Sequence, residues 1–150
     1  MADDRVLALL SAVDLFAGLK PKVLGRIADS GEVVSYDAGA TVLSAGEPTA
    51  GFRAFSPAGV SMHVIVSGSA LVRVRDDLVA TLGPGAYFGE LSLVDGGPRS
   101  ADVAAGDSGL TTFALPKWSF DELLRDHPEV AVPMLRVVST RLRRAEARER

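Results

Sequence analysis

The sequence predicts a mainly β protein, a β roll or jelly-roll barrel of short strands with N-terminal helices before it and two C-terminal helices after it. Two changes of hydrophobic period indicate this order. The period changes from helical spacing to alternation near Glu32 and returns to helical spacing after Pro116. Glycine and proline interrupt the alternating stretch every few residues, which is typical of short strands joined by turns.

A single domain is expected to span residues 1–150, with helices at about 3–30, the β barrel at 32–115 and the closing helices at 117–150. The chain is 47% hydrophobic and 23% charged. A chain of this length buries roughly 68–70% of the surface that it exposes when unfolded, so its core needs no disulfide or metal to hold it. The sequence contains no cysteine, in agreement with this expectation.

The helical segments are predicted from apolar side chains at the i, i+3, i+4 and i+7 spacing. Two short helices are expected between residues 3 and 30, separated by an apolar elbow at 15–19 that should pack against the core. The first closing helix is expected to begin at Ser119, a capping residue followed by two acids. His127-Pro128 interrupts the later apolar stripe, so His127 should cap or turn between the two closing helices.

The alternating region holds seven predicted strands, enough to close a small barrel or two packed sheets. They are Val33–Tyr36, Thr41–Ser44, Met62–Ser67, Ala70–Val74, Val79–Leu82, Ala101–Ala104 and Thr111–Leu115. His63 lies in one of them and is expected to be a surface residue or a hydrogen-bonded residue of the barrel. Trp118 is expected to contribute ordinary packing ahead of the closing helices.

Charge and hydropathy exclude several classes of protein. The formal net charge is −3, and the last ten residues hold five arginines and two glutamates, which leaves −6 on the rest of the chain. This acidic body argues against direct contact with nucleic acid, and the arginine tail is expected to be a solvated helix end. The apolar stretches are too short for a membrane span, and the acidic start at 1–4 is unlike a secretory signal. A cytoplasmic location is therefore expected.

No metal, cofactor or catalytic set is expected. His63 and His127 are the only histidines and cysteine is absent, so the usual imidazole and thiolate metal sites are missing. Glu90 has no partner acid at a useful spacing, and there is no nucleophile elbow. An enzyme built on a metal-binding barrel of the cupin type is disfavoured for the same reason.

The densest group of functional candidates lies at residues 83–101. Gly89 allows the backbone to approach a ligand closely, and Glu90–Leu93 can form one helical turn whose free amides attract phosphate. Arg99 follows far enough along the chain to bring its guanidinium back over those amides. A carboxylate accepts from ribose hydroxyls, an arginine binds phosphate oxygens through two donors, and Ser100 adds one more donor. The pattern predicts an anion site.

Residues 88–93 and 98–101 closely resemble the phosphate-binding cassette of the cyclic nucleotide-binding domain family. That family includes catabolite activator proteins, regulatory subunits of protein kinase A and cyclic-nucleotide-gated channels. Further segments look like family landmarks and occur in the family's order, at residues 15–19, 36–39, 46–48, 64–68 and 126–129. The resemblance therefore covers most of the chain and places the cassette at 88–101.

The resemblance implies a set of ligand-binding residues that combine backbone amides, a ribose acceptor and phosphate donors. The set is Gly89, Glu90, Leu91, Ser92, Arg99 and Ser100. Glu90 would accept from the ribose 2′-hydroxyl, Arg99 would bind the cyclic phosphate, and Ser100 would contact phosphate or base. The base would lie against barrel walls whose candidates are Val72, Leu82 and Val103.

The same resemblance implies the ligand and the output. cAMP is favoured over cGMP as the ligand, and no separate cofactor is implied. The last helix, expected at 129–144, would close over the base as a lid and relay binding to an effector domain or a partner protein. A homodimer is compatible with this arrangement.

Two departures from the family pattern leave an alternative open. Residues 49–61, with Phe52 and Phe55, form a longer loop than the family usually has at that place. Asp102 stands where the family often has a small polar residue, and a carboxylate facing the pocket would weaken phosphate binding. The alternative is a ligand-free relative that acts as a dimerisation or docking module through the final helix and this loop.

Overall fold

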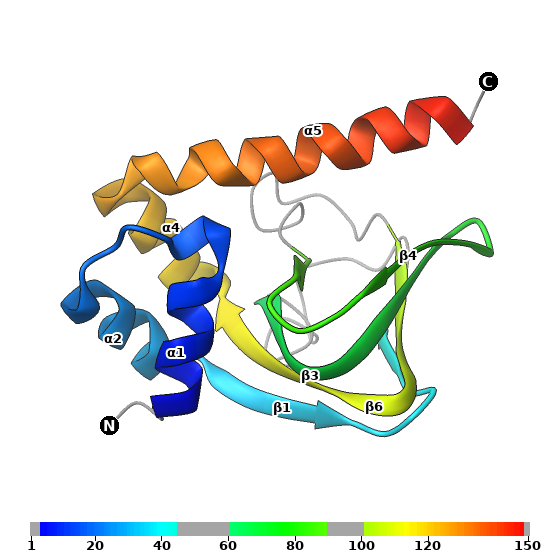
Figure 1. Ribbon diagram of the computed structural model, residues 1–150, viewed down its shortest axis with the longest axis horizontal. Helices are drawn as coiled ribbons and strands as arrows, with labels where there is room; N and C mark the ends of the chain where they lie inside the picture. The colour runs from blue at the N-terminus through cyan, green and yellow to red at the C-terminus, as the bar shows by residue number, and fades with distance from the viewer. Residues whose placement is uncertain (1–3, 45–60, 90–100, 149–150) are drawn as a thin grey trace.

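The computed structural model describes residues 4–44, 61–89 and 101–148 (Figure 1). The elements follow the predicted order, with helices first, then the antiparallel strands of the roll, then helices again. The helices are α1 (Asp4–Ala12), η1 (Asp14–Phe16), α2 (Pro21–Ser30), α4 (Lys117–Asp126), η3 (Pro128–Val130) and α5 (Ala131–Arg148). The strands are β1 (Glu32–Tyr36), β2 (Thr41–Leu43), β3 (Ser61–Val74), β4 (Asp77–Leu82), β5 (Tyr87–Phe88) and β6 (Asp102–Pro116).

The strands form one curled antiparallel sheet in the order β1-β6-β3-β4, in which β2 also pairs with β6 and β5 with β3. Strands β3 and β6 are its longest strands, and they pair from Ser61 opposite Pro116 to Arg73 opposite Asp102. Figure 1 shows both strands bending through the roll, while α1, α2 and α4 gather at one end. The predicted class, a mainly β roll with flanking helices, is confirmed.

The predicted strand boundaries were wrong at two places. The expected pairs at 62–67 and 70–74, and at 101–104 and 111–115, are each one continuous strand, β3 and β6. Gly68 and Gly109 lie at φ +79° and +80°, a left-handed conformation that lets each strand bend without ending. The pairing register with β6 shifts between Gly68 and Ala70, so the ladder is irregular at the bend. The two-residue strand β5 was not predicted.

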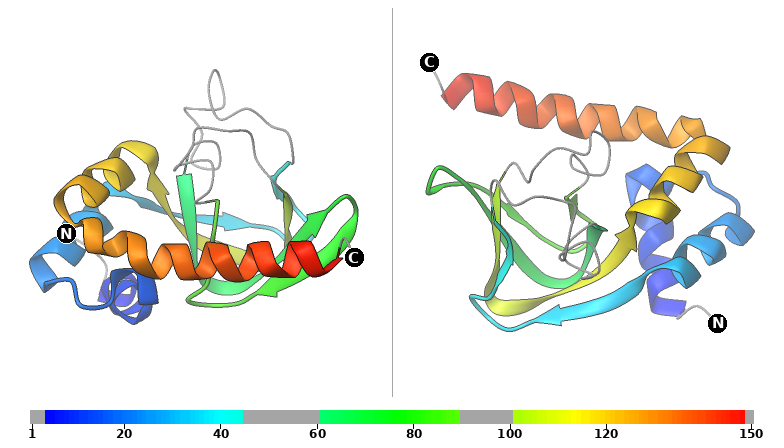
Figure 2. Two further views of the ribbon diagram at one scale, coloured as in Figure 1. Left: turned by 90° about the horizontal axis from the view of Figure 1, so that it is seen from above. Right: turned by 180° about the vertical axis from the view of Figure 1, so that it is seen from behind.

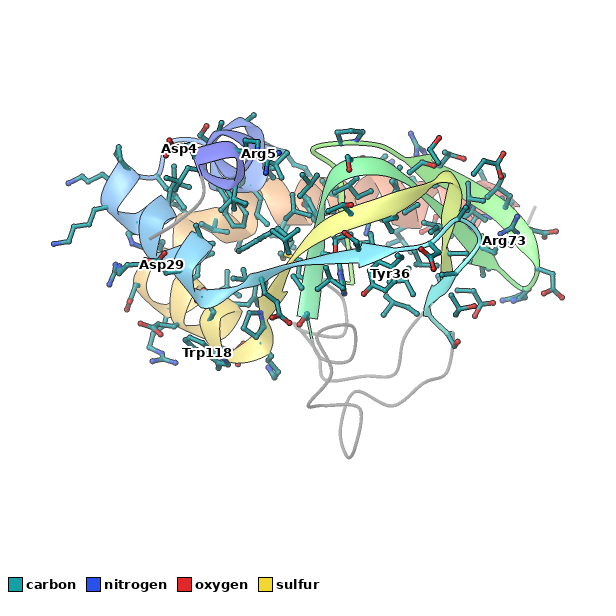
Figure 3. All side chains as sticks on the ribbon, turned by 90° about the horizontal axis from the view of Figure 1, so that it is seen from below. Asp4, Arg5, Asp29, Tyr36, Arg73 and Trp118 are labelled. Carbon is teal, nitrogen blue, oxygen red and sulfur yellow. The ribbon has the colours of Figure 1, made fainter. Side chains whose placement is uncertain are left out.

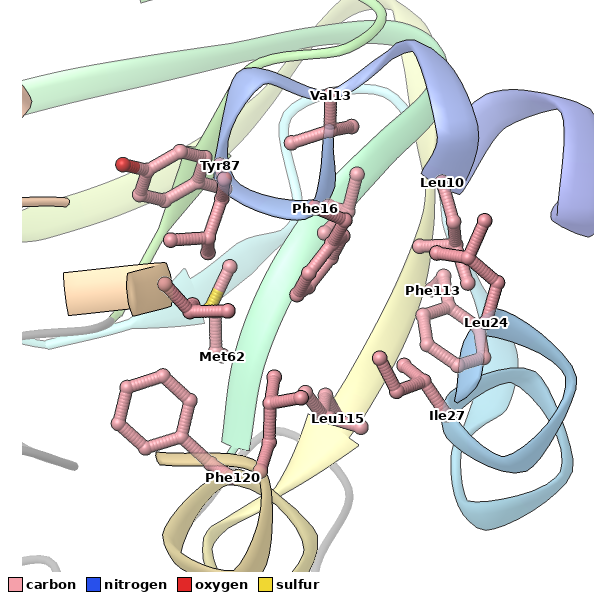
Figure 4. Close-up of a cluster of buried hydrophobic side chains, with 14 of the residues drawn as sticks. Leu10, Val13, Phe16, Leu24, Ile27, Met62, Tyr87, Phe113, Leu115 and Phe120 are labelled. Carbon is pink, nitrogen blue, oxygen red and sulfur yellow. The ribbon is translucent and has the colours of Figure 1, made fainter. Parts of the chain in front are cut away.

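The interior is divided into two hydrophobic clusters that meet along β3. The first, called the helical core, joins the helices to one face of the roll (Figure 4), and its largest buried members include Leu10, Phe16, Met62, Phe113, Leu115 and Phe120. The second, called the roll core, lies inside the curled sheet and comprises Val42, Leu43, Ile65, Ala70, Phe88, Val103, Ala105 and Leu110. Neighbouring residues of β3 point into different cores, because side chains alternate along a strand.

The N-terminal helices behave as their sequence predicts. Pro21 occupies the first turn of α2, where a missing N–H costs nothing. The elbow between α1 and α2 packs as expected, since Leu15 and Phe16 are fully buried in the helical core. Figure 2 shows α1, α2 and α4 grouped at one end, with α5 running from this group across the roll.

The start of the closing helices differs from the prediction. α4 begins at Lys117, so Ser119 is a buried residue inside the helix rather than its cap, and its hydroxyl lies 2.6 Å from that of Ser30 on α2. Trp118 is 62% exposed instead of packed (Figure 3), and it lies at the edge of a shallow groove between α4 and α2. His127 does cap α4, donating its backbone N–H to the Leu123 carbonyl at 2.7 Å.

Gly68→Ala should destabilise the fold far more than Gly39→Ala. Both glycines have positive φ, which costs an alanine about 1–2 kcal/mol. A Cβ on Gly68 would also lie 2.2 Å from the Gly109 carbonyl oxygen, whereas a Cβ on Gly39 would meet nothing within 4 Å. Overpacking should bring the cost at Gly68 to about 3 kcal/mol or more in urea unfolding. Equal losses for the two variants would contradict the tight crossing of β3 and β6.

Candidate functional site

A pocket with a volume of about 350 Å³ lies between the open side of the roll and helix α5. This size is at the lower end of the range for small-molecule sites. Its roll side consists of Leu43, Val72, Val74, Val79, Ala80, Leu82, Phe88, Gly89, Ala101 and Val103. Its helix side consists of Val138, Arg141, Leu142, Arg144, Ala145 and Arg148. The described wall is thus apolar on the roll side, with arginines on the helix side.

The roll wall follows from strand alternation. Val72 and Val74 on β3 point to the pocket, and Ala101 and Val103 do so where β6 begins. Asp102 lies between the last two and is not part of the pocket wall. The carboxylate of Asp102 therefore does not face the described pocket wall, because Val103 points inward at 3% exposure and the acid points elsewhere.

Strand β5 brings the chain to the edge of this pocket. Gly85 and Ala86 hydrogen-bond with Ile65 of β3 at 2.9 Å, and Tyr87 and Phe88 then pair with the same strand. Tyr87 enters the helical core while Phe88 enters the roll core and the pocket wall. The next residue, Gly89, also lines the pocket and has φ +86°, a conformation that favours glycine. The predicted cassette therefore starts at the pocket, from a strand held by β3.

A buried histidine supports the pocket wall from behind. His63 is fully buried, and its ring stacks on Phe88 with centroids 4.9 Å apart and planes at 6°. Its Nδ1 shares a 2.9 Å hydrogen bond with the Thr112 hydroxyl of β6. His63 is thus the hydrogen-bonded barrel residue that the sequence predicts, and it links β6 to the aromatic ring beside Gly89.

Helix α5 is tied to β5 by an arginine. Arg141 donates from a guanidinium nitrogen to the Tyr87 carbonyl at 2.6 Å, and its guanidinium carbon lies 5.8 Å from the centre of the Tyr87 ring. The first contact is a charge-assisted hydrogen bond, and the second is within the range of cation–π attraction. Closer to its start, α5 is anchored by buried Met134 in the helical core. The contact of Arg141 therefore lies where α5, β5 and the pocket meet.

The arginine tail is only partly the solvated helix end that the sequence predicts. Arg141, Arg144 and Arg148 line the pocket, and no aspartate or glutamate joins them among the lining residues that the structure describes. Their spacing, together with Val138 and Ala145, puts them on one face of the helix. That periodicity is visible in the sequence and could have identified this face. Arg143, in contrast, is exposed and outside the pocket.

The predicted wall residues come together in the structure. Val72, Leu82 and Val103, from three different strands, line the same pocket as Gly89. The remaining predicted ligand-binding residues lie outside the described residues, and these are Glu90, Leu91, Ser92, Arg99 and Ser100. Residues 49–60 of the long loop, with its two phenylalanines, also lie outside them. Sequence reasoning missed Leu43 and Phe88 as wall residues.

Other polar features of the described residues point to no further chemistry at this site. Burial raises the pKa of Tyr36, whose ring packs against the roll core, so its hydroxyl stays protonated near neutral pH. Within the described ranges, no three histidine, cysteine, aspartate or glutamate side chains group as metal ligands do. Over the same ranges, no helix has both the length and the hydropathy to cross a membrane.

Comparison with known proteins decides the family. The model of the cyclic nucleotide-binding domain matches residues 33–127, a range that includes the roll, the predicted cassette at 88–101 and the first closing helix. The chain belongs to the cyclic nucleotide-binding domain family.

Relatives of this domain occur in longer regulators. A CRP-like cAMP-activated global transcriptional regulator of Mycobacterium tuberculosis is 28% identical over 91% of this chain and 58% of its own length. A cyclic nucleotide-gated potassium channel of Mesorhizobium japonicum is 36% identical over 82% of this chain and 31% of its own. Among solved structures, cAMP-bound PfPKA-R superposes with a TM-score of 0.81 at 24% identity, covering 96% of this chain and 46% of that one. The chain thus spans between 31% and 58% of the length of these proteins.

Thr112→Val should destabilise the domain more than Thr112→Ser. Valine keeps the shape of the side chain but removes the hydroxyl that His63 needs, which costs about 1–3 kcal/mol in a buried site. Serine keeps the hydroxyl and loses one methyl group, at a cost of about 1 kcal/mol. Chemical denaturation at pH 7 measures both. A serine variant less stable than the valine variant would contradict the structural role of this hydrogen bond.

Proposed function

We propose that this chain is a regulatory cyclic-nucleotide-binding module that binds cAMP in the pocket between roll and α5 and relays binding through α5 to an effector. The observation that carries the proposal is the position of Gly89. This residue belongs both to the pocket wall and to the start of the sequence that resembles the phosphate-binding cassette. The apolar wall that would hold the base would then lie next to the segment that would bind the phosphate.

The roles of the ligand-binding residues are proposed from the family pattern. Arg99 would bind the cyclic phosphate, Glu90 would accept from the ribose 2′-hydroxyl, and Ser100 would add a donor. The amides of Gly89, Leu91 and Ser92 would complete the phosphate and ribose contacts. Charge-assisted hydrogen bonds contribute about 1.5–3 kcal/mol each, so a few of them supply most of the roughly 8 kcal/mol that micromolar binding requires.

The base would lie against the wall formed by Val72, Leu82 and Val103, under the α5 residues Val138 and Ala145. Burial of apolar surface on both sides of a purine adds affinity without reading its identity. cAMP is proposed over cGMP because of the relatives that are described as cAMP-activated or cAMP-bound.

The relay is proposed through the contact between Arg141 and Tyr87. Tyr87 lies two residues before Gly89, so a shift of the cassette would move the Tyr87 carbonyl, to which Arg141 of α5 is hydrogen-bonded. A ligand can shift α5 only by the difference in its affinity for the two arrangements. The ligand would touch α5 directly, and this supports such a difference.

The wider role is also a proposal. We take residues 1–150 as one regulatory domain without catalysis of its own, acting in the cytoplasm, whose effector is another domain or a separate protein contacted through α5. Described relatives include a transcriptional regulator and a channel, each longer than this chain. The homodimer that the sequence is compatible with stays a prediction.

cAMP should raise the unfolding temperature of the chain, and Arg99→Ala should abolish the rise. Ligand at 100 times its dissociation constant adds about 2.7 kcal/mol of stability, which corresponds to about 5–10 °C for a domain of this size. Differential scanning fluorimetry with cAMP and with cGMP measures the shift. Arg125→Ala is the matched control, because Arg125 is an exposed arginine on α4 away from the pocket.

Each outcome of that experiment is decisive. A shift with cAMP that survives in the control and disappears in Arg99→Ala supports the proposed function. A shift that persists in Arg99→Ala would show that the cassette arginine has a different role. No shift with either nucleotide, in a folded protein, would favour the ligand-free docking module instead.

Arg141→Gln should weaken cAMP binding about tenfold, the equivalent of about 1.4 kcal/mol. Glutamine loses the charge-assisted bond to Tyr87 and the contact with its ring, so α5 covers the pocket for a smaller fraction of the time. Isothermal titration calorimetry measures the affinity. Arg136→Gln, an exposed arginine elsewhere on α5, should leave it unchanged. Equal affinities of Arg141→Gln and wild type would show that the contact between Arg141 and Tyr87 does not contribute to ligand binding.

A further inference from the structure

A second hollow, called the α2–α4 groove, lies between helices α2 and α4 and has a volume of about 180 Å³. Its apolar lining includes buried Ile27 from α2 and buried Leu123 from α4. In the described parts of the chain, it shares no lining residue with the pocket beside α5. Figure 2 shows both helices in the group at one end of the molecule. A partner in this groove would therefore leave the nucleotide pocket accessible.

The α4 side of the groove carries three exposed side chains at intervals of four residues. Trp118, Glu122 and Asp126 all line the groove. They lie on successive turns of one helix, with about 6 Å of rise between neighbours, so they form a row along α4. Neither carboxylate has an ion-pair or hydrogen-bond partner among the described residues. The row thus combines an exposed indole with two carboxylates that are available to a guest.

Two hydroxyl groups join the walls of the groove, and the direction of their hydrogen bond can be assigned. The Ser30 hydroxyl donates its proton to the Ile27 carbonyl at 2.8 Å. The 2.6 Å bond between the Ser30 and Ser119 hydroxyls must therefore be donated by Ser119, because each hydroxyl has only one proton. Ser119 is 7% exposed, and no described residue donates to its oxygen. This oxygen is left to accept a hydrogen bond from a guest in the groove.

The oxygens on the α4 side are all available as acceptors, so they call for a guest that is rich in donors. The face of an indole ring attracts cations, and carboxylates prefer charged donors. A guanidinium group has five N–H donors in one plane, stacks on aromatic rings and can bind a carboxylate through two donors. An ammonium group has three donors and no flat face to stack. The α4 side of the groove therefore favours arginine over lysine.

The α2 side supplies one opposing charge. Arg26 is exposed, lines the groove and forms no ion pair with a described residue. His127, at the end of the groove, has its Nδ1 3.2 Å from a carboxylate oxygen of Glu129. A cationic guest would be attracted by Glu122 and Asp126 and repelled by Arg26, whereas an anionic guest would meet the reverse balance. The charges of the groove therefore select a cation.

We propose that the α2–α4 groove binds an arginine side chain of a partner protein. The guanidinium group stacks on the Trp118 ring and donates hydrogen bonds to the Glu122 and Asp126 carboxylates. The buried oxygen of Ser119 accepts a further donor where the two walls meet. Binding does not require nucleotide, because the groove and the pocket are separate. Since α4 continues through η3 into α5, the partner would bind the element that precedes the lid helix.

The test uses the single tryptophan of the chain as a reporter, because Trp118 lines the groove. The full chain, labelled with ¹⁵N and free of nucleotide, is titrated with blocked tripeptides that carry arginine, lysine, glutamine or glutamate between two alanines. The arginine peptide should shift the indole N–H signal of Trp118 in a saturable way. It should bind at least about fivefold more tightly than the lysine peptide, and its affinity should fall as salt is raised.

Charge variants should change this affinity in opposite directions. Glu122→Gln with Asp126→Asn should weaken binding of the arginine peptide at least about fivefold, whereas Arg26→Gln should strengthen it about twofold or more. Asp76→Asn with Asp107→Asn is the matched control, because it removes the same charge from two exposed acids outside the groove. This control should leave the affinity unchanged. Circular dichroism confirms that each variant is folded.

The proposal is overturned if the arginine peptide binds no better than the glutamine peptide, or if no peptide gives saturable binding. It is equally overturned if the paired acid variant binds as the wild type does, or if Arg26→Gln weakens binding. A preference for the glutamate peptide would show that Arg26 selects an anion instead. Because Arg26→Gln is expected to strengthen binding, loss of folding cannot imitate the expected result.

Discussion

Burial of β3 on both of its faces is the constraint on which the rest of the structure depends. Val64 is fully buried in the helical core and its neighbour Ile65 is fully buried in the roll core, so the strand cannot slide by one residue without exchanging the two environments. β5 pairs with β3 and repeats the pattern, with Tyr87 in one core and Phe88 in the other. The chain therefore reaches Gly89 from a position that both cores determine.

Helix α5 is fixed relative to the roll and has two sides with different surroundings. Met134 anchors its first half in the helical core, and Arg141 ties its second half to the Tyr87 carbonyl at the edge of the pocket. One side of the helix thus lines the pocket, while the other presents Leu135 and Arg136 to solvent. A rigid helix with these two sides can connect what occupies the pocket to what binds outside it, because both would act on one element.

Much of the fold could be predicted from the sequence, because its hydrophobic period changes twice and turn residues separate the strands. The resemblance to the family also implied Val72, Leu82 and Val103 as wall residues, and these do line one pocket. The prediction failed where one residue type serves two purposes. Gly68 looks like a turn but bends a continuous strand, and the arginines of the last helix look solvated although Arg141 is held against Tyr87. Local sequence does not reveal which side of such a helix meets the roll.

The central claim is that the pocket and α5 form one unit, so that α5 responds to pocket occupancy. Hydrogen–deuterium exchange of the full chain, with and without saturating cAMP, tests it most directly. The account predicts slower exchange both at Tyr87 and Phe88 and along α5 from Val138 to Arg148, with little change in α1 and α2. Protection confined to the roll, with exchange of α5 unchanged although cAMP is bound, would contradict it.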